Sequence, residues 1–339
     1  MAVTAPTGEN ETEVGKVPTR FGNARRIAAR MFGKRFGGIW VLVIIIVLFS
    51  ALIPHTFLTV LTLQTTLSDG AVTAIMALGV MFPLLTGIFD ISIAWVAGFA
   101  MVLSSYLNLR FGLGAIPICV VTLVASGLFG ALSAIFVTKL KVNSIVTTLG
   151  VGTVALGLTE MITQGNSISP NFSNTFFDFG QGVFLHIPLP FIYALVLAVA
   201  MYYVLEYTAL GRQLRAIGGN PTAARLAGVQ VLKLQAGVLI FSAVLSGFAG
   251  LVLATEIGTA TESTAPAFLL PAAAAVFLGA TQIKIGPNPW GTIVAILLLG
   301  IGIKGLQLMG ASTWVGDFFN GVVLLVAVAV SGEGIERLV

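Results

Sequence analysis

The residues that could support catalysis or metal binding are few and isolated. The 339-residue chain has two histidines, His55 and His186, and a single cysteine, Cys119, far apart in the sequence. Metal sites and nucleophile–base pairs need such residues in clusters. No G-x-x-x-x-G-K-[ST] phosphate-binding loop occurs, and a dinucleotide-like pattern at residues 300–305 falls within an apolar stretch with no strand before it. The sequence therefore indicates no enzyme, no metal site and no cofactor.

One acidic residue stands where two apolar stretches meet with almost no loop. Asp90 follows Thr86-Gly87-Ile88-Phe89 and is followed, two positions on, by Ser92. Broken backbone at membrane depth is tolerated only where it faces protein or a wet cavity. Asp90 therefore either caps the next helix or, together with Thr86 and Ser92, lines a route for a polar solute.

One basic residue lies within an apolar stretch near its outer end. Lys304 is followed three positions on by Gln307, on a similar helix face. An ionisable group inside a membrane is a functional candidate by default, but a lysine near a helix end can also extend its ammonium to the lipid headgroups. The candidate translocation path consists of Thr86, Asp90, Ser92, Lys304 and Gln307.

These residues must be positioned by membrane helices. The chain is 57% hydrophobic and 9% charged, whereas soluble proteins are about 25% charged, and several apolar runs reach the ~20 residues that cross a bilayer. The sequence predicts an all-α polytopic membrane protein. The net charge of +4 does not indicate nucleic-acid binding, because Lys and Arg mark the cytoplasmic side of membrane proteins.

The hydropathy pattern predicts about ten membrane spans in one domain, residues 37–339. These spans cover residues 38–58, 66–87, 91–109, 113–137, 144–163, 187–206, 235–256, 265–282, 289–309 and 312–331. Residues 1–36 form a polar, basic tail that either rests on anionic lipid as an interfacial helix or remains a solvated tail. An N-in, C-in orientation places all but Arg110 and Lys304 of the 17 Lys and Arg inside, as the positive-inside rule favours.

The longest basic interruption lies between two predicted spans, at residues 207–234. Gly218-Gly219 predict a sharp turn. Asn220 and Pro221 are favoured residues for the cap and first position of a short helix, and Gly228 predicts its left-handed end. Because two helical turns are marginal alone in water, we expect this helix to pack on its own protein and on a partner.

This segment resembles the cytoplasmic coupling loop of ribose-type ABC importer permeases. The resemblance rests on Gly211-Arg212, on AIGGNP at residues 216–221 and on AARLAG at residues 223–228. It extends over roughly residues 38–331, and its other matching segments are residues 138–143, 147–150, 269–281 and 290–292. Residues 85–92 also resemble the Gly-Gly-Ile-Asp-Leu-Ser segment of the family, from which they depart at Ile88-Phe89.

The resemblance implies a permease in the bacterial cytoplasmic membrane that imports a pentose, hexose or related polyol. Its implied partners are cytoplasmic ABC ATPase subunits, an external or periplasmic solute-binding protein, and a second permease copy in a homodimer or heterodimer. The implied ATPase-coupling residues are Gly218, Gly219, Asn220, Pro221, Ala223, Ala224, Arg225 and Gly228. The alternatives are a nucleoside, amino acid or signalling furanone on the same fold, an ion-coupled secondary transporter, and a structural subunit of a membrane complex.

Overall fold

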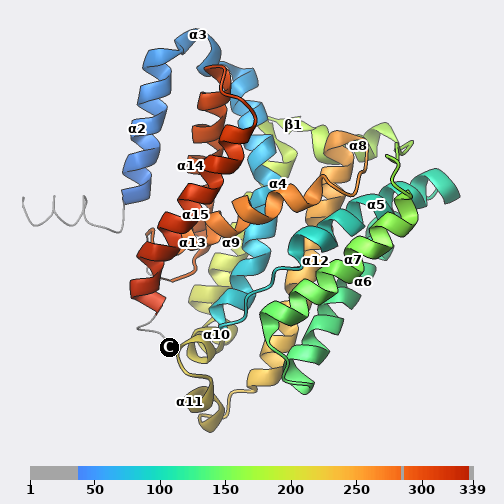
Figure 1. The fold of residues 1–339 in the computed structure, drawn as a ribbon, viewed down its shortest axis with the longest axis vertical. Helices are drawn as coiled ribbons and strands as arrows, with labels where there is room; N and C mark the ends of the chain where they lie inside the picture. The colour runs from blue at the N-terminus through green and yellow to red at the C-terminus, as the bar shows by residue number, and fades with distance from the viewer. Residues whose placement is uncertain (1–36, 284–285, 336–339) are drawn as a thin grey trace, which may run out of the picture.

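The computed structural model describes residues 37–283 and 286–335, and these form an α-helical bundle with one small hairpin (Figure 1). The predictions for the basic N-terminal tail, Lys284 and Arg337 lie outside the described residues. In chain order the elements are α2 (Gly37–Leu52), α3 (Pro54–Phe57), α4 (Val60–Leu85), α5 (Ile93–Phe111), α6 (Ala115–Ala134), the π-helical turn η2 (Ile135–Lys139), α7 (Ser144–Thr163), α8 (Asn174–Gln181), β1 (Val183–Phe184), β2 (Ile187–Pro188), α9 (Leu189–Tyr207), α10 (Ala209–Gly219), α11 (Pro221–Leu226), α12 (Val231–Ile257), the 3-10 turn η3 (Ala265–Phe268), α13 (Leu269–Ala280), α14 (Pro289–Leu308) and α15 (Trp314–Ile335).

Each predicted span coincides with a helix of the structure. Among the described residues, seven helices are long and apolar enough to cross a membrane: α4, α5, α6 with η2, α7, α9, α12 and α14. Shorter apolar helices, α2, η3 with α13, and α15, occupy the three remaining predicted spans. The all-α polytopic class is therefore confirmed, while the count of ten crossings and the N-in, C-in orientation stay predictions.

Two helices form the centre of the bundle. In α4, 83% of the apolar stretch is buried inside the protein and in α12 67%, compared with 33% in α7 and 28% in α9. α12 packs against α4, α5 and α6, and Figure 1 shows it running between α4 and the α5–α7 group. The outer helices keep large apolar side chains exposed, as expected where lipid is the solvent.

Small residues allow the central helices to touch backbone to backbone. A Cβ added to Gly130 of α6 would lie 2.6 Å from the Cα of Ile240 in α12. This distance is shorter than any that two non-bonded carbon atoms adopt, so the added Cβ would clash. This crossing therefore depends on glycine, because only a residue without a Cβ permits such close approach of two helices.

Candidate functional site

The loop between α9 and α12 folds into two short helices at the end of the molecule opposite α3 (Figure 1). The first, α10, is capped by Thr208, whose hydroxyl accepts a hydrogen bond from the Gly211 amide at 3.4 Å. Gly211, Leu214 and Ile217 are buried at three-residue spacing and hold α10 on the bundle. Arg215 forms an ion pair with Glu206 of α9. The base of the loop is thus a packed helix.

The prediction of a sharp turn at Gly218-Gly219 is wrong. α10 continues through Gly219, and the chain turns at Asn220, whose backbone is extended with φ −159°. Gly218 has a different role, because a Cβ there would clash with the carbonyl oxygen of Leu85 at the end of α4. Thr208 as a cap and the 211–214–217 spacing were the signals that could have predicted α10.

The predicted boundaries of the second helix, α11, are confirmed. The Asn220 side chain accepts a hydrogen bond from the Ala223 amide at 2.9 Å, and Pro221 is the first helical residue. Gly228 has a φ of +86°, the left-handed conformation that ends helices. The amides of Gly228 and Val229 bond to the carbonyls of Arg225 and Ala224, each at 3.0 Å. Both ends of α11 are therefore defined by local chemistry.

α11 has one face on the protein and one face free. Ala224 is 5% exposed and packs with Ile217 of α10 and Val231 of α12. Ala223, Arg225 and Ala227 are exposed, so they are available for contact with another molecule. Leu226 is 86% exposed. Sequence reasoning did not select it, although it is the one large apolar residue of α11.

A buried carboxylate, that of Asp90, lies in the non-helical segment between α4 and α5. Asp90 is 2% exposed. Its Oδ1 accepts hydrogen bonds from the Ser92 amide at 3.0 Å and the Ser92 hydroxyl at 2.6 Å. Its Oδ2 accepts from the hydroxyl of Ser242, in the middle of α12, at 2.8 Å. Asp90 therefore links the break to the central helix.

This geometry extends the helix-cap interpretation of Asp90, because the carboxylate accepts from the Ser92 amide at the start of α5 and also from α12. The cap position of α5 is Ser92, and its side chain makes no capping bond. Thr86 is also buried, and its hydroxyl donates to the carbonyl of Pro83 at 2.8 Å. The structure thus joins Asp90 to Ser92 and buries Thr86 as well inside the protein.

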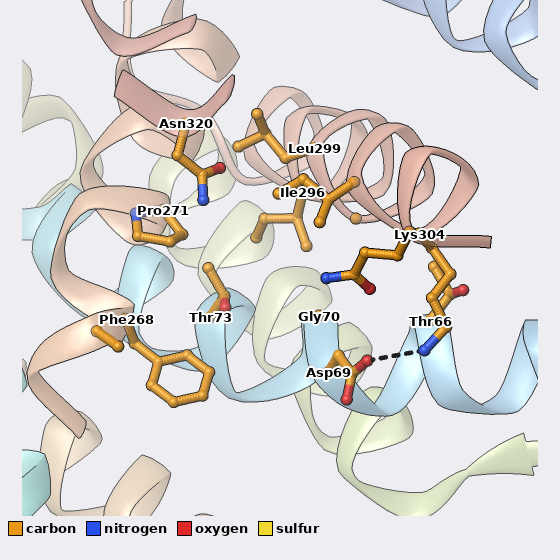
Figure 2. A pocket seen from close by; sticks show the side chains of 14 residues that line it. Thr66, Asp69, Gly70, Thr73, Phe268, Pro271, Ile296, Leu299, Lys304 and Asn320 are labelled. Carbon is orange, nitrogen blue, oxygen red and sulfur yellow. Dashed lines mark hydrogen bonds and ion pairs between the residues drawn. The ribbon is translucent and has the colours of Figure 1, made fainter. Parts of the chain in front are cut away.

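Lys304 and Gln307 lie elsewhere, on a cavity of about 220 Å³ between α4, α13, α14 and α15. Figure 2 shows Lys304 reaching across to Asp69 of α4, with 3.4 Å between Nζ and Oδ2. The cavity is also lined by Thr66, Gly70, Thr73, Ala267, Phe268, Pro271, Ile296, Leu299, Gly300, Ile303 and Asn320. Sequence reasoning missed Asp69, although a lysine within a span needs a partner.

The two groups of path residues are separated along α4. Asp69 and Leu85 are about 24 Å apart at 1.5 Å per residue. The cavity and the Asp90 break are therefore distinct sites on the same central helix.

The fold and these features define a polytopic membrane permease. A capped helix is exposed at one end, a buried polar break joins the central helices next to it, and a polar-lined cavity lies farther along them. The chain belongs to the family described as the branched-chain amino acid transport system / permease component, whose model matches residues 62–328.

Relatives of the chain are named as permeases for sugars. The chain is 31% identical to the ribose import permease protein of Bacillus subtilis (strain 168), over 86% of this chain and 90% of that protein. It is 29% identical to an L-arabinose ABC transporter permease protein of Azospirillum brasilense, over 86% and 88%. It is 26% identical to the D-allose transport system permease protein of Escherichia coli (strain K12), over 88% and 92%. No solved structure matches the chain significantly.

Proposed function

We propose that this chain is the membrane permease subunit of an ATP-driven importer of a monosaccharide or related polyol. Relatives that align over most of its length are named for ribose, L-arabinose and D-allose. The structural observation that carries the proposal is α11, which is fixed at both ends, exposed on one face and packed on the other. A surface of this kind suits docking to a separate subunit.

The partners follow from this assignment. ABC ATPase subunits bind the exposed face of α11 in the cytoplasm, and a solute-binding protein delivers the sugar at the opposite face of the bacterial inner membrane. A second permease copy completes the pair of subunits that two ATPases require. The chain itself hydrolyses no ATP.

The contacts of the loop suggest how movement of the ATPase reaches the spans. Displacement of α11 acts on the start of α12 through the Ala224–Val231 contact. It acts on the end of α4 through α10, because Gly218 lies directly against Leu85. The Asp90–Ser242 hydrogen bond joins the segment that follows α4 to α12, so it links the two helices on which the loop acts. We propose that Thr86, Asp90 and Ser92 form a joint, meaning a buried contact between α4, α5 and α12, near the solute path. This joint transmits the shear movement of the packed helices.

Uptake is expected to require ATP hydrolysed by the partner and to be independent of ion gradients. Proteoliposomes containing this chain, its ATPase and its binding protein should accumulate the labelled sugar when ATP is supplied on the side of the membrane that carries the ATPase. Collapse of the pH and sodium gradients should leave the rate unchanged. Omission of the ATPase is the control. Sugar uptake driven by a pH or sodium gradient without ATP would establish a secondary transporter and reject the proposal.

A further inference from the structure

We infer that the cavity between α4, α13, α14 and α15 is a binding site for one uncharged, polyhydroxylated solute. This inference rests on the proposed function and deepens it, because it assigns a solute site within the permease chain itself. The cavity has a volume of about 220 Å³, below the ~300–1,000 Å³ of pockets for drug-sized ligands. Its size therefore suits a small solute.

A buried amide without a partner is the strongest sign of a ligand. Asn320 of α15 is 6% exposed, and its Oδ1 has no hydrogen-bond partner among the described residues. Figure 2 shows its side-chain amide at the cavity, with the nitrogen toward Thr73 of α4 and the oxygen toward Leu299 of α14. Buried polar atoms are normally satisfied, and each exception calls for an explanation. A half-turn of the amide presents this oxygen to a solute hydroxyl in the cavity.

The charges of the cavity favour a neutral solute. Asp69 and Lys304 already pair with each other, so the lining has no net formal charge. A charged solute would have to lose its hydration without gaining an unpaired counter-charge. The two groups retain further capacity, since a carboxylate accepts several hydrogen bonds and an ammonium donates three. They can therefore bind hydroxyl groups without separating.

The remaining lining supplies mixed donors and acceptors around an apolar wall. The hydroxyls of Thr66 and Thr73 and the amide of Gln307 each can donate and accept. Phe268 and Pro271 lie at the end away from Lys304 (Figure 2) and offer apolar surface to the carbon–hydrogen face of a sugar ring. Apolar walls with a few converging polar groups are typical of small-molecule sites. Hydroxyl groups, which donate and accept, match this set.

The first test replaces Asn320. In the complete transporter in proteoliposomes, Asn320→Leu is expected to lower ATP-driven uptake of D-ribose, L-arabinose or D-allose, whichever the wild type imports, by about tenfold or more. Its melting temperature should stay the same or rise, because the substitution removes a buried unpaired oxygen. ATPase co-purification should be unchanged. Asn108→Leu is the control, since the Asn108 amide oxygen is likewise buried and unpartnered but lines a different cavity. This variant also loses the hydrogen bond from the Asn108 amide nitrogen to the Leu113 carbonyl at 3.1 Å, and it should still retain uptake.

The second test measures occupancy directly. In the full-length protein carrying Cys119→Ala, the Thr73→Cys thiol should react with a hydrophilic maleimide, and the imported sugar should slow this reaction several-fold. L-Leucine at the same concentration should not. Protection by an added phospholipid and not by the sugars would show that the cavity binds lipid, and would overturn the inference.

The outcomes separate the inference from the proposed function. Wild-type import of a sugar together with normal import by Asn320→Leu overturns the cavity assignment alone. A lower melting temperature of Asn320→Leu with proportionate loss of uptake assigns Asn320 a structural role and also overturns it. Suppose that L-leucine is imported with ATP, that no sugar is imported, and that no sugar slows the reaction of the Thr73→Cys thiol. This result rejects the sugar assignment and the inference together.

Discussion

Ala223→Glu is expected to abolish co-purification of the ATPase and solute uptake while leaving membrane insertion unchanged. Ala223 is exposed on α11, which lies outside the apolar spans. Its small side chain permits close approach of a partner, and a glutamate there would be buried without a counter-charge in the docked complex. Such a charge costs several kcal/mol, about 3–5. Arg225 on the same exposed part of the helix should strengthen docking, because a guanidinium binds carboxylates bidentately.

The measurement is pull-down of the ATPase by the tagged permease, followed by uptake in proteoliposomes. Ala209→Glu is the matched control, since it adds the same charge at the exposed start of α10, where a helix N-terminus favours an acidic residue. If Ala223→Glu binds the ATPase and transports as the wild type does, α11 is only a connector and the coupling assignment fails.

Leu226→Ser gives an independent measure of the same surface. The side chain is 86% exposed in the isolated chain, so its loss should leave the melting temperature unchanged. If a partner covers it, about 1.5–3 kcal/mol of binding free energy is lost, which is roughly tenfold or more in affinity. Equal ATPase affinity in wild type and variant would show that Leu226 remains exposed in the complex.

The sequence predicted those elements whose ends are set by local chemistry. Asn143 caps α7, and its Oδ1 accepts from the Ile145 amide at 2.9 Å; the predicted span, residues 144–163, has the same limits as the helix. α11 was predicted for the same reason, through Asn220 and Gly228. In these cases the backbone bonds are satisfied by residues within a few positions, so a single segment contains the information.

The sequence could not predict contacts between residues far apart in the chain. Asp90 meets Ser242 across 152 positions, and Lys304 meets Asp69 across 235. Each pairing depends on how the helices pack, and neither partner has a local signal. Asp90 was expected either to cap the helix that follows it or to line a route for the solute, and neither expectation included the bond from its second oxygen to α12. Asn320 was missed because its polarity becomes unusual only once α15 closes the cavity.

Asp90→Ala is expected to destabilise the protein by about 3 kcal/mol or more. The substitution leaves the Ser92 amide and the Ser242 hydroxyl buried without an acceptor, and each unsatisfied group costs about 1–3 kcal/mol. Thermal unfolding in detergent measures the loss. Asp90→Asn should retain much of the stability, because its amide oxygen can still accept one set of these bonds.

A double-mutant cycle then tests whether Asp90 acts through Ser242. Ser242→Ala removes the donor in α12, so the combined variant should lose less stability than the two single variants summed, with a coupling of about 0.5–3 kcal/mol. Uptake should fall in each of these variants, and the two substitutions should be non-additive in uptake as they are in stability. ATPase binding should remain, because α11 is unaltered. This result would mean that movement of the loop acts on the joint between α4, α5 and α12. If Asp90→Ala unfolds at the wild-type temperature but does not transport, the carboxylate contacts the solute directly, and the assignment of Asp90 as a joint is wrong.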